Sequence, residues 1–238
     1  MKIKSRNKVK KKEIVEFYNN FVDELARENY PEAQYSITRL KLLDAELSKI
    51  ENDNILDVGG GAGLLVPVLY KNTKTLTETD LSPRLVKKAK ERYRNLKSIK
   101  FMTADAENLK FADKSFDVVV CSEAIEHMLK PEKALKELCR VARKAILITT
   151  PNVFNKKSLL VRFVKLFHKT NQHSGQIYDQ KVELSKIRKT LEENKFKITK
   201  VKGLYYPFTP RIICNFLEKI NIAPSYASCL YIKAEAVK

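Results

Sequence analysis

Apolar side chains recur every three or four positions in two early segments of the chain. The first segment is residues 13–26 and the second is residues 33–50. This spacing places the apolar residues on one side of a helix. We therefore predict two amphipathic helices before residue 51.

From residue 54 onward, short apolar runs alternate with amphipathic segments of helix length. The expected strands are 54–58, 75–79, 99–103, 116–121 and 145–150, and the expected helices are 63–71, 83–96 and 131–143. Strands that read as continuous apolar runs are buried on both faces, which is typical of a parallel sheet covered by helices. Beyond residue 151 we expect a basic amphipathic segment at 156–169, helices at 184–194 and 211–220, and strands at 196–204 and 228–236.

Length and composition fit one globular domain. The chain has 238 residues, and none of its apolar runs reaches the ~18 residues of a membrane span. It has no apolar segment behind its basic N-terminus, so we expect a cytoplasmic protein without a secretory signal. The cysteines Cys121, Cys139, Cys214 and Cys229 lie far apart and are expected to be reduced thiols.

The net charge of +18 is concentrated at the two ends of the chain. Residues 1–12 carry +7, residues 156–238 carry +11, and the intervening segment is neutral. We interpret residues 1–12 as a basic tail. The excess favours an anionic partner such as an acidic membrane surface, but 35 of the 46 basic residues are lysine, which also fits a lysine-rich proteome. Nucleic-acid readers favour arginine, so nucleic acid is the weaker reading.

The most informative segment is residues 55–63, which read Ile-Leu-Asp-Val-Gly-Gly-Gly-Ala-Gly. An apolar strand runs into spaced glycines and then a helix, whose free N–H groups suit a carboxylate or phosphate. The next strand ends at Asp80, placed to accept hydrogen bonds from ribose hydroxyls. Leu64 stands where the dinucleotide fingerprint GxGxxG has its last glycine, so that fingerprint is not met.

These residues resemble motif I and the second-strand acid of the class I S-adenosylmethionine-dependent methyltransferases. The likeness continues through residues 104–107, 115–119, 121–127 and 149–152, and covers about residues 33–236. It implies an α/β, Rossmann-like, seven-stranded and mostly parallel sheet with an antiparallel last strand and helices on both faces. Residues 13–238 would form this single domain, with 153–180 as a substrate lid. A Lys-Pro-Gly-Gly turn usual before the fifth strand is absent at residues 140–145.

The resemblance also implies S-adenosylmethionine as cofactor and assigns its contacts. Asp80 would bind the ribose. Asp105, together with Ala106, would bind the adenine amine. The full set of cofactor-binding residues is Asp57, Gly59, Gly61, Gly63, Asp80, Leu81, Asp105, Ala106 and Ser122.

Past the fourth strand, Glu126 and His127 are the candidate catalytic residues. A base is needed if the acceptor is an alcohol, phenol or protonated amine, and histidine suits that role; otherwise the two residues simply line the crevice. The Glu-x-x-Glu-His pattern and residues 172–178 look most like the ubiquinone-pathway O-methyltransferases. A third reading is a divalent-metal site formed by Glu123, Glu126, His127 and His173.

The segment 156–169 has one polar stripe, formed by Ser158, Arg162, Lys165 and Lys169, and is otherwise largely apolar. We interpret it as a lid over the site, as an interfacial helix on an anionic membrane, or as a dimer contact.

The function that follows is methyl transfer to a small-molecule acceptor, expected at oxygen, on a quinol, phenol or lipidic hydroxyl. The alternatives are RNA methylation and a non-catalytic S-adenosylmethionine-binding subunit. Monomer and homodimer both remain open.

Overall fold

The computed structural model describes residues 10–20, 33–152, 180, 182–204, 227 and 229–237. In chain order the elements are α1 (Lys11–Asn20), α3 (Ala33–Leu47), β1 (Asn54–Val58), α4 (Val66–Lys71), β2 (Thr75–Asp80), α5 (Pro83–Arg92), β3 (Ile99–Thr103), β4 (Phe116–Ser122), the 3₁₀ turn η2 (Ile125–His127), α6 (Pro131–Val141), β5 (Ala142–Pro151), α8 (Leu184–Glu193), β6 (Phe196–Leu204) and β7 (Cys229–Ala236).

The seven strands form one sheet in the order β3-β2-β1-β4-β5-β7-β6. The pairs from β3 to β5 are parallel, and β7 runs antiparallel to both β5 and β6. Strand β6 therefore points the same way as the first five. The predicted seven-stranded, mostly parallel sheet with an antiparallel last strand is confirmed.

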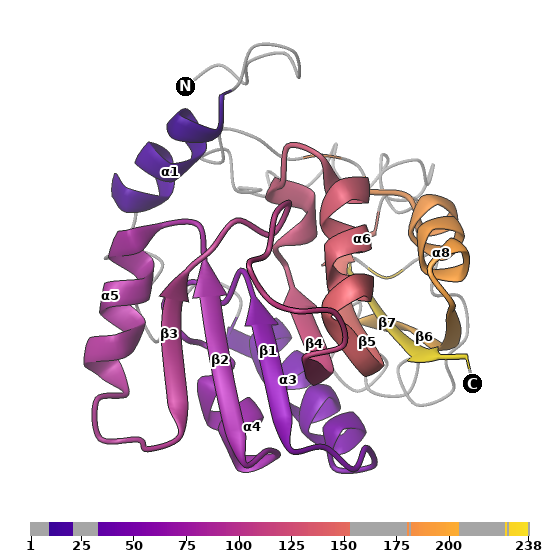
Figure 1. The fold of residues 1–238 in the computed structure, drawn as a ribbon, viewed down its shortest axis with the longest axis horizontal. Helices are drawn as coiled ribbons and strands as arrows, with labels where there is room; N and C mark the ends of the chain where they lie inside the picture. Colours follow the sequence, from indigo (N-terminus) through magenta and orange to yellow (C-terminus); the bar gives the residue numbers. More distant parts are fainter. Residues whose placement is uncertain are drawn as a thin grey trace, which may run out of the picture.

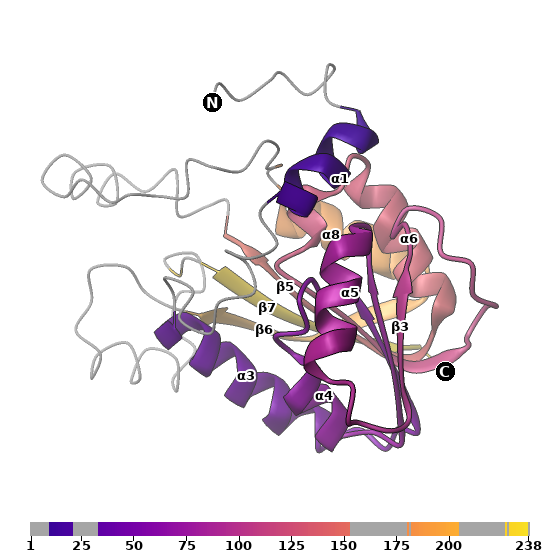
Figure 2. The same cartoon turned by 90° about the vertical axis from the view of Figure 1, so that its left-hand side faces the viewer.

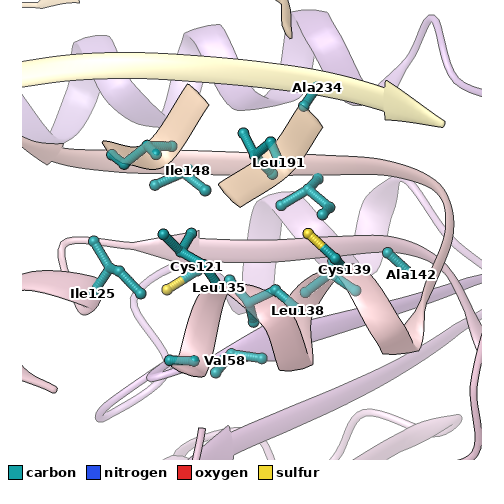
Figure 3. Close-up of a cluster of buried hydrophobic side chains, with 14 of the residues drawn as sticks. Val58, Cys121, Ile125, Leu135, Leu138, Cys139, Ala142, Ile148, Leu191 and Ala234 are labelled. Atoms are coloured by element: carbon teal, nitrogen blue, oxygen red, sulfur yellow. The ribbon is translucent and has the colours of Figure 1, made fainter. Parts of the chain in front are cut away.

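One face of the sheet is covered by α6 and α8. The central strand β4 is buried on both faces, as its apolar residues 118–121 predicted. Figure 3 shows Leu135 and Leu138 of α6 and Leu191 of α8 packed in a single apolar cluster. The sulfur atoms of Cys121 and Cys139 lie in the same cluster, and both cysteines are free thiols, as expected.

The opposite face is covered by α3, α4 and α5 (Figure 2). Leu43 and Leu47 of α3 and Leu69 of α4 are fully buried against Ile55 and Leu147 of the sheet. The helix predicted at 33–50 therefore forms by packing its apolar stripe on the sheet. Within the described residues, no helix combines the length and the apolar character that crossing a bilayer requires.

Two element boundaries differ from the sequence prediction for a visible reason. Helix α6 ends at Val141 and β5 begins at the next residue, Ala142, three residues earlier than predicted. This direct passage explains why no Lys-Pro-Gly-Gly turn is needed. Helix α1 begins at Lys11, so the last residues of the segment interpreted as a basic tail belong to a helix.

Several predicted features lie outside the described residues. These are residues 1–9, the end of the first predicted helix, the segment 156–169 with nearly all of the predicted lid, Cys214, His173 and the predicted helix at 211–220.

The carboxyl ends of β1, β2, β3 and β4 meet at one edge of the sheet, because these strands are parallel. Figure 1 shows α1 above this edge, over the top of α5 and on the side of the sheet that carries β3 and β2. In sheets of this kind, ligands bind in the crevice outside the carboxyl ends of the strands. This edge is therefore where the predicted site residues gather.

Candidate cofactor and methyl-transfer site

The glycine loop follows β1 and is tied to β2. The N–H groups of Gly59 and Gly60 both donate to the Thr79 carbonyl oxygen, at 2.8 and 3.0 Å. Gly59 has a φ of +77°, and a Cβ added there would lie 2.5 Å from the Cβ of Ala124. Any side chain at Gly59 would therefore collide with the segment that follows β4.

Asp80 ends β2 and is fixed by two backbone donors. Its Oδ2 accepts from Gly61 N–H at 3.0 Å and its Oδ1 from Ser82 N–H at 2.8 Å. Burial raises the pKa of Asp80, and these backbone hydrogen bonds oppose the rise. The carboxylate is thereby held beside the glycine loop with acceptor capacity left over, which suits a pair of ribose hydroxyls.

Asp57 lies beneath the loop with unused acceptors. It is 1% exposed, and neither carboxylate oxygen has a hydrogen-bond partner among the described residues. Burial, followed by the charge of Asp80, raises the pKa of Asp57 to about 7, while Arg39 lowers it. Buried unpartnered carboxylates are costly, so a cation at the loop would stabilise this group.

The adenine end of the predicted site is already contacted by a lysine. Lys11 Nζ of α1 lies 2.6 Å from Asp105 Oδ2 and 3.1 Å from Glu107 Oε2. Burial alone would lower the pKa of Lys11, but the hydrogen bonds to the two carboxylates raise it. Asp105 Oδ1 accepts from Glu107 N–H at 3.0 Å. The acid predicted to bind the adenine amine is therefore shared with α1.

The rest of α1 covers the same edge. Ile14 packs on Leu81, and Tyr18 packs on Ala62 of the glycine loop. The Tyr18 ring also lies edge-on to His127, with ring centroids 5.9 Å apart. One ten-residue helix thus reaches from the predicted adenine position to the predicted transfer position.

Three chemically active side chains follow β4. Glu126 is 2% exposed, and its Oε2 accepts from Thr150 Oγ1 at 3.2 Å. His127 Nε2 lies 3.8 Å from Glu126 Oε1, and the His127 side chain is partly exposed. Glu123 has a φ of +52°, and its Oε1 accepts from Cys229 Sγ at 3.2 Å. The pattern Glu-x-x-Glu-His therefore leaves the histidine partly exposed after the end of β4 and buries Glu126 beside it.

The predicted metal site involves one residue that the structure does not describe. In the part of the chain that the structure describes, no three His, Cys, Asp or Glu side chains form a group that could hold a metal ion. His173, the fourth predicted ligand, lies outside that part.

The remaining predicted contacts lie at the same edge. Ala106 and Leu81 are half-buried, and Ser122 Oγ is 2.7 Å from Thr149 Oγ1 at the ends of β4 and β5. Sequence reasoning missed Lys11, Tyr18 and Glu78. The amphipathic pattern of α1 predicted a helix but not what it covers, whereas Glu78 was visible as an acid inside an otherwise buried strand.

A Rossmann-like sheet, a glycine loop after β1 and a fixed acid at the end of β2 define a protein that binds a nucleoside cofactor. Residues 56–148 match the family model described as a methyltransferase domain. The matched stretch is the one whose motifs resemble those of the class I S-adenosylmethionine-dependent methyltransferases.

Curated relatives carry related activities. The chain is 35% identical over 113 residues to a malonyl-[acyl-carrier protein] O-methyltransferase of Marinomonas, covering 47% of this chain and 42% of that protein. It is 37% identical over 101 residues to the ubiquinone/menaquinone biosynthesis C-methyltransferase UbiE of Rickettsia massiliae, covering 39% and 41%. The chain thus spans less than half the length of these relatives.

Solved structures share the fold over nearly the whole chain. Magnesium protoporphyrin IX methyltransferase from Synechocystis, solved with bound S-adenosylmethionine, superposes with a TM-score of 0.64 at 15% identity. The match covers 95% of this chain and 96% of that one. At this identity the likeness supports the fold alone.

Proposed function

We propose that the protein transfers a methyl group from S-adenosylmethionine to a small-molecule acceptor, at an oxygen atom. The observation that carries the proposal is Asp80, which is fixed to Gly61 at the carboxyl edge of the sheet. Around it lie Asp57 and the glycine loop at the end of β1, and Asp105 just after the end of β3. Incubation with the cofactor labelled in its methyl group, across quinol, phenol, malonyl-thioester and RNA acceptors, tests both the activity and the acceptor class.

The residues present fit the cofactor. Asp80 would accept from the ribose hydroxyls, Asp105 from the adenine amine, and Asp57 offers buried negative charge for the ammonium group. When bound, the cofactor supplies a methyl group already activated on a sulfonium. The protein's contribution is then alignment of the acceptor and placement of charge.

His127 is the proposed general base. Its side chain is partly exposed at the crevice, whereas Glu126 is buried behind it and faces its Nε2. We therefore assign proton removal from an acceptor hydroxyl to His127. Glu126, held by Thr150, is the positioning residue that orients the imidazole. Glu123 is directed toward Cys229 instead.

O-methylation is favoured over C-methylation by this base at the crevice, and one named relative is an O-methyltransferase. Turnover in excess chelator distinguishes His127 acting alone from a metal site completed by His173.

Lys11 should control how firmly α1 closes over the cofactor. Replacing Lys11 by Gln removes the charge that bridges Asp105 and Glu107, so α1 loses its anchor at the adenine end. We expect S-adenosylmethionine to dissociate several-fold faster in stopped-flow measurements, on the scale of a partly exposed ion pair. Lys12→Gln is the matched control, because Lys12 is exposed on the same helix. Equal dissociation rates for the two variants would remove Lys11 from the site.

The segment 156–169 is proposed to bind anionic lipid beside the site. Replacing Arg162, Lys165 and Lys169 by Gln should reduce co-sedimentation with vesicles that contain anionic lipid, and should make it less sensitive to salt. Neutral vesicles are the control. Equal sedimentation with both vesicle types, before and after substitution, would leave the lid and dimer readings of this segment.

A further inference from the structure

Glu78 is a buried acid to which the cofactor site assigns no role. It lies in the middle of β2, directly opposite Asp57 of β1 in the parallel register. Ile55 and Leu76 face the side of the sheet that carries α3 and α4, so by alternation Asp57 and Glu78 face that side too. Glu78 is 2% exposed, and neither of its carboxylate oxygens has a hydrogen-bond partner among the described residues.

The two carboxyl groups meet directly under the glycine loop. A Cβ added at Gly60 would lie 2.7 Å from Glu78 Cγ and 2.9 Å from Asp57 Oδ2. Both acids therefore contact the same point of the loop backbone. Because residue 60 is a glycine, the loop backbone can approach these two carboxyl groups closely.

The charged groups around the pair do not compensate two negative charges. Asp80 adds a third acid from the end of β2, whereas Arg39 of α3 faces Asp57 and Arg92 of α5 faces Glu78. Within the described part of the chain, neither arginine hydrogen-bonds to these carboxylates, and Arg92 Nη1 lies 3.4 Å from the Ala62 carbonyl oxygen. Two ionised carboxylates buried this close together would be strongly unfavourable.

We propose that Asp57 and Glu78 act as one carboxyl pair that keeps a single proton, with Glu78 as the positioning residue that tunes the charge Asp57 presents to the cofactor. In this pair Glu78 remains neutral at neutral pH and Asp57 carries the ionisable charge. Burial, and next the charge of Asp57, raise the pKa of Glu78 to about 9, well above that of Asp57. The two groups titrate as a unit.

The role of the pair rests on the proposed function. The ammonium group of the cofactor, bound above the loop, would be stabilised by one negative charge. Its binding would therefore favour loss of the proton from Asp57. If Glu78 were also ionised, its charge would repel the charge of Asp57 in the buried space beneath the glycine loop. Because the pKa of Asp57 is raised to about 7, cofactor binding should release protons from Asp57 near neutral pH, while Glu78 keeps its own proton.

Unfolding measurements test the retained proton without any ligand. An acid whose pKa is raised by folding destabilises the folded state progressively as pH rises from its unfolded to its folded pKa. Glu78→Gln cannot ionise, so its folding constant relative to wild type should rise by about tenfold or more between about pH 6 and about pH 8. The thermal midpoint of Glu78→Gln minus that of wild type should therefore be about 3–6 °C larger at the higher pH than at the lower.

Glu46→Gln is the matched control. Glu46 is equally buried, at 3% exposure, but its Oε1 lies 2.7 Å from Lys200 Nζ. Although burial opposes it, the hydrogen bonds from Lys200 and Lys49 lower the pKa of Glu46. Its loss should therefore destabilise the protein by the same amount at both pH values. A Glu78→Gln difference that is flat with pH, like that of Glu46→Gln, would overturn the retained proton.

Calorimetry on the wild-type protein gives a second test that needs no Glu78 variant. Titration with S-adenosylmethionine at about pH 7, in buffers of different ionisation enthalpy, should show proton release that is lost in Asp57→Asn. Binding with the same proton count in wild type and Asp57→Asn would overturn the role of the pair. Absence of any binding would instead contradict the proposed function, and leave the unfolding result to decide the protonation of Glu78.

Discussion

Replacing Asp80 by alanine should weaken S-adenosylmethionine binding by about ten- to a hundredfold. The reason is that hydrogen bonds to a charged acceptor contribute about 1.5–3 kcal/mol, and Asp80 is the acid placed to receive them from the ribose. The substitution also removes the partner of Gly61 N–H, so the loop keeps only the hydrogen bonds of Gly59 and Gly60 to Thr79. Calorimetric titration of the folded variant gives the affinity directly.

Asp53→Ala is the control for this substitution. Asp53 immediately precedes β1, at the opposite edge of the sheet, and its side chain is 66% exposed in an ion pair with Lys74. Its removal should leave cofactor affinity unchanged. If Asp80→Ala binds as tightly as wild type while circular dichroism shows an intact fold, Asp80 does not hold the ribose.

Replacing His127 by alanine should lower turnover by about a hundred- to ten-thousandfold, which is the usual contribution of a general base. Cofactor affinity should change little, because His127 is proposed to lie at the transfer position and not among the residues expected to bind adenosine. Added imidazole should restore part of the rate.

A Thr150→Val variant separates the base from its support. Thr150 donates to Glu126 and is itself buried, so its loss should weaken turnover less than the loss of His127. Wild-type turnover in His127→Ala would show that the histidine only lines the crevice. The proton acceptor would then have to be sought elsewhere at this edge.

The sheet could be predicted because buried parallel strands appear in the sequence as short apolar runs. Strand β4 is buried on both faces and carries the apolar run 118–121, and the glycine loop and Asp80 mark the ends of β1 and β2. The spacing of those markers also predicts the edge at which we expect the cofactor. These features are local, so one sequence is enough to find them.

The covering of the site could not be predicted, because it depends on contacts between distant segments. The periodicity of α1 shows that one side of the helix is buried, but not that Lys11 reaches Asp105, 94 residues away. In the same way, the pattern Glu-x-x-Glu-His does not reveal that Glu126 is buried against Thr150 while His127 reaches the crevice. Glu78 and Asp57 become a pair only through the register of β1 and β2.

Titration of the wild-type protein with S-adenosylmethionine tests the assignment of this edge most directly. One molecule should bind per chain with a dissociation constant in the micromolar range, which is about 8 kcal/mol, and the demethylated product should compete for the same site. If the folded protein shows no heat of binding and no thermal shift at millimolar cofactor, the assignment of this edge as the cofactor site is contradicted.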